Sequence, residues 1–136
     1  MAGELFVDTS GWYPIAVRDH PDHEPLAEAL RERVTAGWRV VTTNLVVAET
    51  HALLLRRVGR GAALDFVREA RREPLVVVDS TADLEREAIR DWLVPYDDQP
   101  FSLVDAVSFA VMTERGISDA LALDRHFTVA GFNRVS

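Results

Sequence analysis

Four acidic side chains that are far apart along the chain stand next to, or inside, segments with the pattern of regular elements. Asp8 follows the apolar run Leu5–Val7, and Asp124 follows the apolar run Ala120–Leu123. Ligands of open α/β sheets bind outside the carboxyl ends of the strands, so two neighbouring strands would bring Asp8 and Asp124 together. Taken singly, each aspartate also has a structural explanation, because aspartate commonly caps the turn that follows a strand.

Glu49 and Asp105 lie in segments whose apolar spacing predicts helices. The residues three and four positions from Glu49 are apolar, so we expect its carboxylate on the buried face of a helix, where it must be aimed at a partner. A salt bridge to an arginine beneath the helix is the structural alternative. Asp105 shares a helix face with Ser102, one turn earlier, although an acid near a helix N-terminus is also favoured by the helix dipole alone.

If the four carboxylates converge, their mutual repulsion must be relieved. Two like charges about 4 Å apart repel by roughly 4 kcal/mol at an effective dielectric constant near 20, and several such pairs would rival a domain's stability of about 5–15 kcal/mol. The acids must then share protons or hold a cation, and all-oxygen ligands suit Mg²⁺ or Mn²⁺. Such an ion activates a bound water, aligns it on phosphorus and stabilises the leaving oxygen, so the pattern favours metal-dependent hydrolysis of a phosphate ester.

Short apolar runs alternate with helical patterns along the chain, and these elements must position the acids. The predicted strands lack strict alternation, as in parallel strands buried on both faces, and cover residues 5–7, 40–43, 75–78, 120–123 and, more weakly, 132–135. The predicted helices cover residues 25–36, 45–58, 62–72, 82–93 and 103–115. Thr81 and Ser102 are predicted N-caps. The alternation predicts a three-layer α/β/α sandwich with a mainly parallel central sheet.

Composition limits the class of protein. We expect a single domain over residues 1–136, without cysteines for disulfides or thiolate metal sites. No apolar run reaches the roughly 20 residues of a membrane span, and the first residues lack a basic and then apolar leader, so we expect a cytoplasmic protein that does not bind membranes. The net charge of −7 is unfavourable for nucleic-acid binding, although all 15 basic residues are arginine and a bound cation would offset the charge.

Four short motifs resemble, in their order along the chain, those of the PIN domain family and, within it, the VapC toxins. They are Phe6-Val7-Asp8-Thr9-Ser10, Val47-Ala48-Glu49, Leu103-Val104-Asp105-Ala106 and Leu123-Asp124-Arg125-His126-Phe127. Each motif is short, but the ordered set is fairly specific and spans essentially the whole chain. One departure is Asp119, which stands at the start of the predicted strand that leads to Asp124. We expect an apolar or small residue at that position.

The resemblance implies a PIN-like fold and Mg²⁺- or Mn²⁺-dependent endonucleolytic cleavage of RNA, leaving a 5′ phosphate and a 3′ hydroxyl. It also implies a cognate antitoxin protein, and VapC-like proteins often form homodimers. By position, the metal ligands and catalytic residues are Asp8, Glu49, Asp105 and Asp124. The residues expected to hydrogen-bond these ligands or to contact phosphate are Thr9, Ser10 and Ser102. The alternative is a PIN-like module that binds RNA or protein without cleaving it, and the intact acids argue against it.

Several imidazole and guanidinium groups are possible RNA contacts. His126 lies two residues after Asp124 and could touch the substrate. A basic stretch that includes Arg56, Arg57 and Arg60 could follow an RNA backbone, although a solvated surface paired with nearby acids is the simpler interpretation.

Two further features have structural alternatives. The wide apolar arc of the helix at residues 45–58 belongs either to the core or to an interface with another subunit or an antitoxin helix. His20 and His23 form an HxxH pair in a proline-rich stretch rather than on a regular helix face, so we do not expect a zinc site there.

Overall fold

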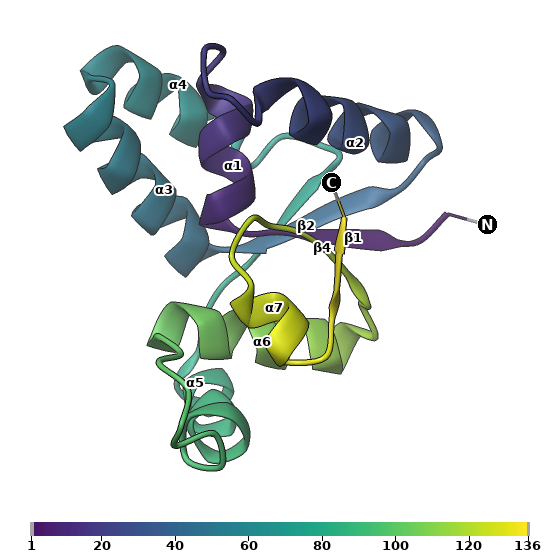
Figure 1. The fold of residues 1–136 in the computed structure, drawn as a ribbon, viewed down its shortest axis with the longest axis vertical. Coiled ribbons are helices and arrows are strands. Elements are labelled where there is room, and N and C mark those ends of the chain that lie inside the picture. The colour runs from purple at the N-terminus through teal and green to yellow at the C-terminus, as the bar shows by residue number, and fades with distance from the viewer. Residues whose placement is uncertain (1, 136) are drawn as a thin grey trace.

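A parallel sheet of five strands forms the centre of the computed structural model, which describes residues 2–135 (Figure 1). The strands are β1 (Glu4–Val7), β2 (Arg39–Thr43), β3 (Leu75–Val78), β4 (Asp119–Leu121) and β5 (Asn133–Val135). They lie in the order β3-β2-β1-β4-β5, and every neighbouring pair is parallel. The chain therefore runs outward from β1 to one edge of the sheet, returns, and continues to the other edge.

Helices cover both faces of this sheet (Figure 1). One layer holds α1 (Thr9–Ala16), α2 (His23–Thr35), α3 (Asn44–Arg57) and α4 (Arg60–Glu69). The opposite layer holds α5 (Ala82–Ala88), which continues into the π-helical turn η1 (Ile89–Leu93), together with α6 (Leu103–Arg115) and α7 (His126–Val129). Within residues 2–135, no helix combines the length and the apolar character needed to cross a bilayer. The predicted α/β/α sandwich is confirmed.

The core lies on both sides of β1, whose side chains Leu5, Phe6 and Val7 are fully buried. On the α6 side, the ring of Phe127 packs 6.1 Å from Phe6 and 5.0 Å from Phe109, measured between ring centroids. Burying a side chain of this size contributes about 1.5–3 kcal/mol, and each aromatic pair adds about 0.5–1.5 kcal/mol. This packing anchors α7, which is only one turn long and follows directly after the loop that carries Asp124.

A close approach of backbone to backbone joins the carboxyl ends of β1 and β4. The Asp8 amide donates to the Leu121 carbonyl at 3.3 Å. In the first turn of α1, a Cβ atom on Gly11 would lie 2.3 Å from the same carbonyl oxygen. Only glycine therefore lets α1 start this close to the end of β4. The strand order reverses between β1 and β4, which is where ligands bind in open α/β sheets.

Most predicted elements are present within two or three residues of their expected bounds, and Thr81 and Ser102 are N-caps as predicted. Two helices, α1 and α7, were not predicted, because α1 contains a glycine and an internal proline and α7 has only four residues. The strand predicted over residues 120–123 corresponds to β4, which ends earlier, at Leu121. Asp119 does begin β4, and its carboxylate forms an ion pair with Arg33 at 3.0 Å, which explains an acid at that position.

Candidate metal centre

The four predicted acids line one pocket at the carboxyl end of the sheet, between the start of α1, the side of α3, the start of α6 and the loop after β4. They are Asp8, Glu49, Asp105 and Asp124. The acids therefore come together near the carboxyl ends of β1 and β4, where the sequence predicted that they would meet. The acids differ in burial and in their hydrogen-bond partners, and these differences decide what each can do.

Asp8 is the N-cap of α1 and is almost fully buried, with 4% of its surface exposed. Its Oδ2 accepts hydrogen bonds from the Ser10 amide at 3.2 Å and the Ser10 hydroxyl at 2.9 Å. Burial raises the pKa of Asp8 to about 6, and the nearby charge of Asp105 acts in the same direction, while the Ser10 hydrogen bonds oppose the shift. The ionised form of Asp8 is therefore costly unless a positive charge lies near it.

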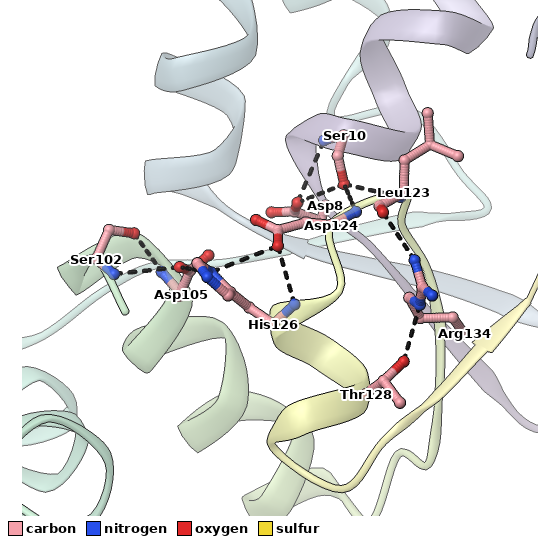
Figure 2. A network of polar contacts seen from close by, with 9 residues as sticks. All are labelled: Asp8, Ser10, Ser102, Asp105, Leu123, Asp124, His126, Thr128 and Arg134. Carbon is pink, nitrogen blue, oxygen red and sulfur yellow. Dashed lines mark hydrogen bonds and ion pairs between the residues drawn. The ribbon is translucent and has the colours of Figure 1, made fainter. Parts of the chain in front are cut away.

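The Ser10 hydroxyl connects Asp8 to the loop after β4 (Figure 2). While donating to Asp8, its Oγ accepts hydrogen bonds from the amides of Leu123 at 3.0 Å and Asp124 at 3.1 Å. The same loop is held from its other side by Arg134, which donates to the Leu123 carbonyl at 2.8 Å. These bonds fix the position of the loop that carries Asp124. Asp124 lies three residues beyond the end of β4, and not directly after the strand as the sequence indicated.

Asp105 is held at the first turn of α6 by a capping box with Ser102. The Ser102 hydroxyl accepts from the Asp105 amide at 3.0 Å, and Asp105 Oδ2 accepts from the Ser102 amide at 3.1 Å. The same Oδ2 also lies 3.1 Å from Nδ1 of His126. Capping therefore explains part of this carboxylate's position but leaves it facing the pocket.

Asp124 and His126 complete a tight group with Asp105 (Figure 2). Asp124 Oδ1 accepts from the His126 amide at 2.9 Å and lies 3.4 Å from the His126 Nδ1. One possible ligand atom from each of the three residues lies within 4.8 Å of the other two, which is close enough to surround one cation. The sequence had indicated that His126 could touch the substrate, but not that its ring lies close to two of the acids.

Glu49 lies on α3 with its side chain exposed, and the expectation that it lies on the buried face was wrong. The fully buried positions of α3 are Val46, Thr50 and Leu54, so the helix packs through a narrower stripe than its apolar composition indicated. Within the described residues, Glu49 has no ion pair, so the alternative of an arginine beneath the helix is not observed either. Glu49 therefore borders the pocket as an exposed residue of α3.

The three predicted hydroxyl residues also line the pocket, but with different contacts. Ser10 and Ser102 bond to predicted metal ligands, as expected from the resemblance. Thr9 is buried, and its Oγ1 accepts from Thr50 at 3.2 Å, so it joins α1 to α3.

Of the three arginines predicted to contact RNA, Arg57 lines the pocket, and its guanidinium carbon lies 5.6 Å from the centre of the Tyr13 ring. Arg56, next to Arg57 on α3, and Arg60, at the start of α4, are exposed, and none of these three arginines has an ion pair among residues 2–135. Tyr13 itself lines the pocket and was missed from the sequence because α1 was not predicted.

The two histidines of the HxxH pair make separate contacts. His20 Nδ1 accepts from the Asp22 amide at 3.0 Å, while His23 Nδ1 lies 2.9 Å from the Pro14 carbonyl oxygen. His20 nevertheless lines the same pocket as the acids, next to Tyr13.

Comparison with known proteins gives consistent matches over nearly the whole chain. The PIN domain family matches residues 5–133. The chain is 40% identical over 131 residues to the 23S rRNA-specific endonuclease VapC20 from two strains of Mycobacterium tuberculosis, covering 96% of this chain and 97% of the relative. The crystal structure of Mycobacterium tuberculosis VapC20, described as a Sarcin-Ricin loop cleaving toxin, superimposes with a TM-score of 0.86 at 38% identity, covering 94% of this chain and 95% of that one. The chain therefore belongs to the PIN domain family, and its relatives over this length are VapC endonucleases.

Proposed function

We propose that this protein is an endoribonuclease that uses Mg²⁺ or Mn²⁺, held by Asp8, Glu49, Asp105 and Asp124, to hydrolyse RNA phosphodiester bonds. The observation that carries the proposal is that these four acids, far apart in sequence, line one pocket at the switch point of the sheet. A divalent ion bound there would activate a water molecule and stabilise the leaving oxygen. The products are a 5′ phosphate and a 3′ hydroxyl, as the family resemblance implies.

The residues present fit a divalent cation. Asp8 is buried, and burial raises its pKa to about 6, so near neutral pH its charge lacks a compensating partner. A cation beside it would supply that charge, and carboxylate oxygens are the ligands that hard divalent ions prefer. Ser10 and Ser102 orient Asp8 and Asp105 before any ion arrives, which limits the reorganisation needed on binding.

RNA reaches the acids, in this proposal, along α3 and the start of α4. Arg57 is held over Tyr13 at the pocket wall and would contact a phosphate near the scissile one, with Arg56 and Arg60 farther along the strand. Three guanidinium groups without an ion pair among residues 2–135, one of them at the pocket, would offset the unfavourable net charge of −7 where the substrate binds.

We infer that the substrate is a loop of the large ribosomal subunit RNA, because the relative is named as a 23S rRNA-specific endonuclease and its crystal structure is described as that of a Sarcin-Ricin loop cleaving toxin. The relative is also described as a toxin, and we propose, from the family resemblance, a toxin neutralised by a cognate antitoxin and acting in the cytoplasm as a homodimer of single-domain chains. Leu55 on α3 and Val58, the C-cap of α3, support a protein partner, because they are exposed rather than buried in the core, at 47% and 52%.

The test is cleavage of a ribosomal RNA loop transcript by purified protein with Mg²⁺, with Mn²⁺ and with a chelator. The variants Asp8→Asn and Asp105→Asn should lose cleavage, whereas Asp97→Asn, an exposed acid outside the pocket, should retain it. Equal cleavage by all four proteins would identify a contaminating nuclease and end the proposal. RNA binding without cleavage under any of these conditions would instead support a non-cleaving module.

The toxin role has a separate test in cells. Induced expression should arrest growth, and co-expression of the protein encoded beside it should restore growth. The Asp105→Asn variant serves as the inactive control, and normal growth of cells expressing the unprotected wild type would contradict the toxin role.

A further inference from the structure

We propose that His126 is a direct ligand of the divalent cation through its Nδ1, alongside Asp105 and Asp124. The inference rests on the cation site of the proposed function, but not on the RNA chemistry. It changes the site from a purely carboxylate set to a mixed nitrogen and oxygen set. From the sequence, His126 was expected only as a possible contact of the substrate.

The distances around His126 Nδ1 match those between adjacent ligands of one ion. Nδ1 is hydrogen-bonded to Asp105 Oδ2 at 3.1 Å and lies 3.4 Å from Asp124 Oδ1, so a cation bound here would take the place of the proton shared by Nδ1 and Asp105. Neighbouring ligands of a six-coordinate ion with metal–ligand distances of about 2.0–2.1 Å are roughly 3 Å apart. Among the described residues, this is the one group of three or more potential ligands whose atoms lie so close together. Asp8 and Glu49 border the same pocket but fall outside this group.

The imidazole ring is held in place before an ion binds. Its amide donates to Asp124 Oδ1, and its ring packs edge-on against Phe101 with 5.3 Å between centroids. The next residue, Phe127, is fully buried, so the backbone that carries the ring is anchored in the core. Only 20% of the His126 side chain is exposed, and little side-chain freedom remains to be lost on binding.

An imidazole ligand has a consequence for metal choice. Carboxylate and water ligands suit Mg²⁺ and Mn²⁺ alike, whereas imidazole suits transition metals and is a poor ligand for Mg²⁺. We therefore expect the site to prefer Mn²⁺ to Mg²⁺ by more than a carboxylate-only site would.

The decisive measurement is pulsed electron paramagnetic resonance of Mn²⁺ bound to the wild-type protein without RNA. A coupling to a directly bonded nitrogen should appear, and it should change when histidine is labelled with the heavy nitrogen isotope. The coupling should disappear in His126→Asp, which keeps a ligand oxygen, and persist in His20→Gln, a matched control from the same pocket. Wild-type Mn²⁺ spectra without a histidine nitrogen coupling would overturn the inference.

Binding titrations provide a second readout on variants whose folding is checked by circular dichroism. His126→Gln should weaken Mn²⁺ binding by about 10-fold or more and Mg²⁺ binding less, while His126→Asp should restore Mn²⁺ binding and reduce the preference for Mn²⁺. Unchanged Mn²⁺ affinity in His126→Gln would contradict a ligand role. These measurements contain no RNA, so the two proposals can fail separately. Absence of RNA cleavage would not remove a nitrogen coupling, and absence of the coupling would not contradict RNA cleavage.

Discussion

Replacing Asp8 with asparagine should make the metal-free protein more stable at neutral pH, although it should abolish cleavage. Burial raises the pKa of Asp8 from 3.8 to about 6, so the folded state holds the proton more tightly than the unfolded state. The stability that comes with this proton is present below about pH 4 and is lost as the pH rises through about 6. Asparagine is neutral at every pH, and its side-chain oxygen can still accept the bonds from Ser10.

The size of the effect follows from the pKa. A shift of about two pKa units corresponds to roughly 3 kcal/mol, because each unit is worth about 1.36 kcal/mol. This is the cost, well above pH 6, of holding Asp8 ionised without a cation. For a domain of this length, about 3 kcal/mol raises the midpoint of thermal unfolding by roughly 10 °C.

The assay is thermal unfolding followed by circular dichroism, in a chelator, over a series of buffers from pH 4 to pH 8. Asp8→Asn should unfold at the higher temperature near pH 7.5, and the difference from wild type should shrink towards zero near pH 4. Asp97→Asn provides the control for removing an exposed charge. An Asp8→Asn midpoint equal to that of wild type at pH 7.5, or a gain that does not depend on pH, would refute the reasoning. Adding Mn²⁺ should then stabilise the wild type and not the variant.

Three further changes test the parts that hold the site. Gly11→Ala should lower the free energy of unfolding by about 1–3 kcal/mol or more, because its Cβ would clash with the Leu121 carbonyl; an unchanged urea midpoint would contradict this. Ser10→Ala should weaken Mn²⁺ binding by about 10- to 100-fold by releasing the Asp124 loop, whereas Ser10→Thr, which keeps the hydroxyl, should bind more nearly as wild type in the same calorimetric titration. Arg57→Ala should weaken RNA binding and reduce the slope of log affinity against log salt by about 1; Arg57→Lys should keep the slope, and equal slopes for all proteins would exclude a phosphate contact.

The sheet and its long helices could be predicted from the sequence because their signals are local. Uninterrupted apolar runs marked the buried parallel strands, and Ser102 marked the start of α6. The position of the candidate site could also be predicted, because ligands of open parallel sheets bind outside the carboxyl ends of the strands, where Asp8 and Asp124 were expected. These features depend on neighbouring residues and on a general rule of topology, which a single sequence contains.

The parts that could not be predicted depend on tertiary contacts. The sequence of α1 looks unfavourable for a helix, and its glycine is explained only by the carbonyl of Leu121, which is more than 100 residues away in the chain. Glu49 is flanked by apolar residues, yet α3 packs on the sheet through a stripe that leaves this carboxylate in solvent. The packing partner, and not the local pattern, decides these cases.

In the proposed metal centre, hydrogen bonds hold the acids in place without a bound cation. Ser10 holds Asp8 and the Asp124 loop together, and the capping box holds Asp105, all through bonds that need no ion. An arrangement fixed in this way keeps carboxylates near one another at a cost in stability, which for Asp8 alone is roughly 3 kcal/mol of the 5–15 kcal/mol typical of a domain. The metal-free fold already carries this cost, so a cation that removes it would bind more tightly. In the proposed metal centre, the burial that destabilises ionised Asp8 would therefore also strengthen the binding of a cation beside it.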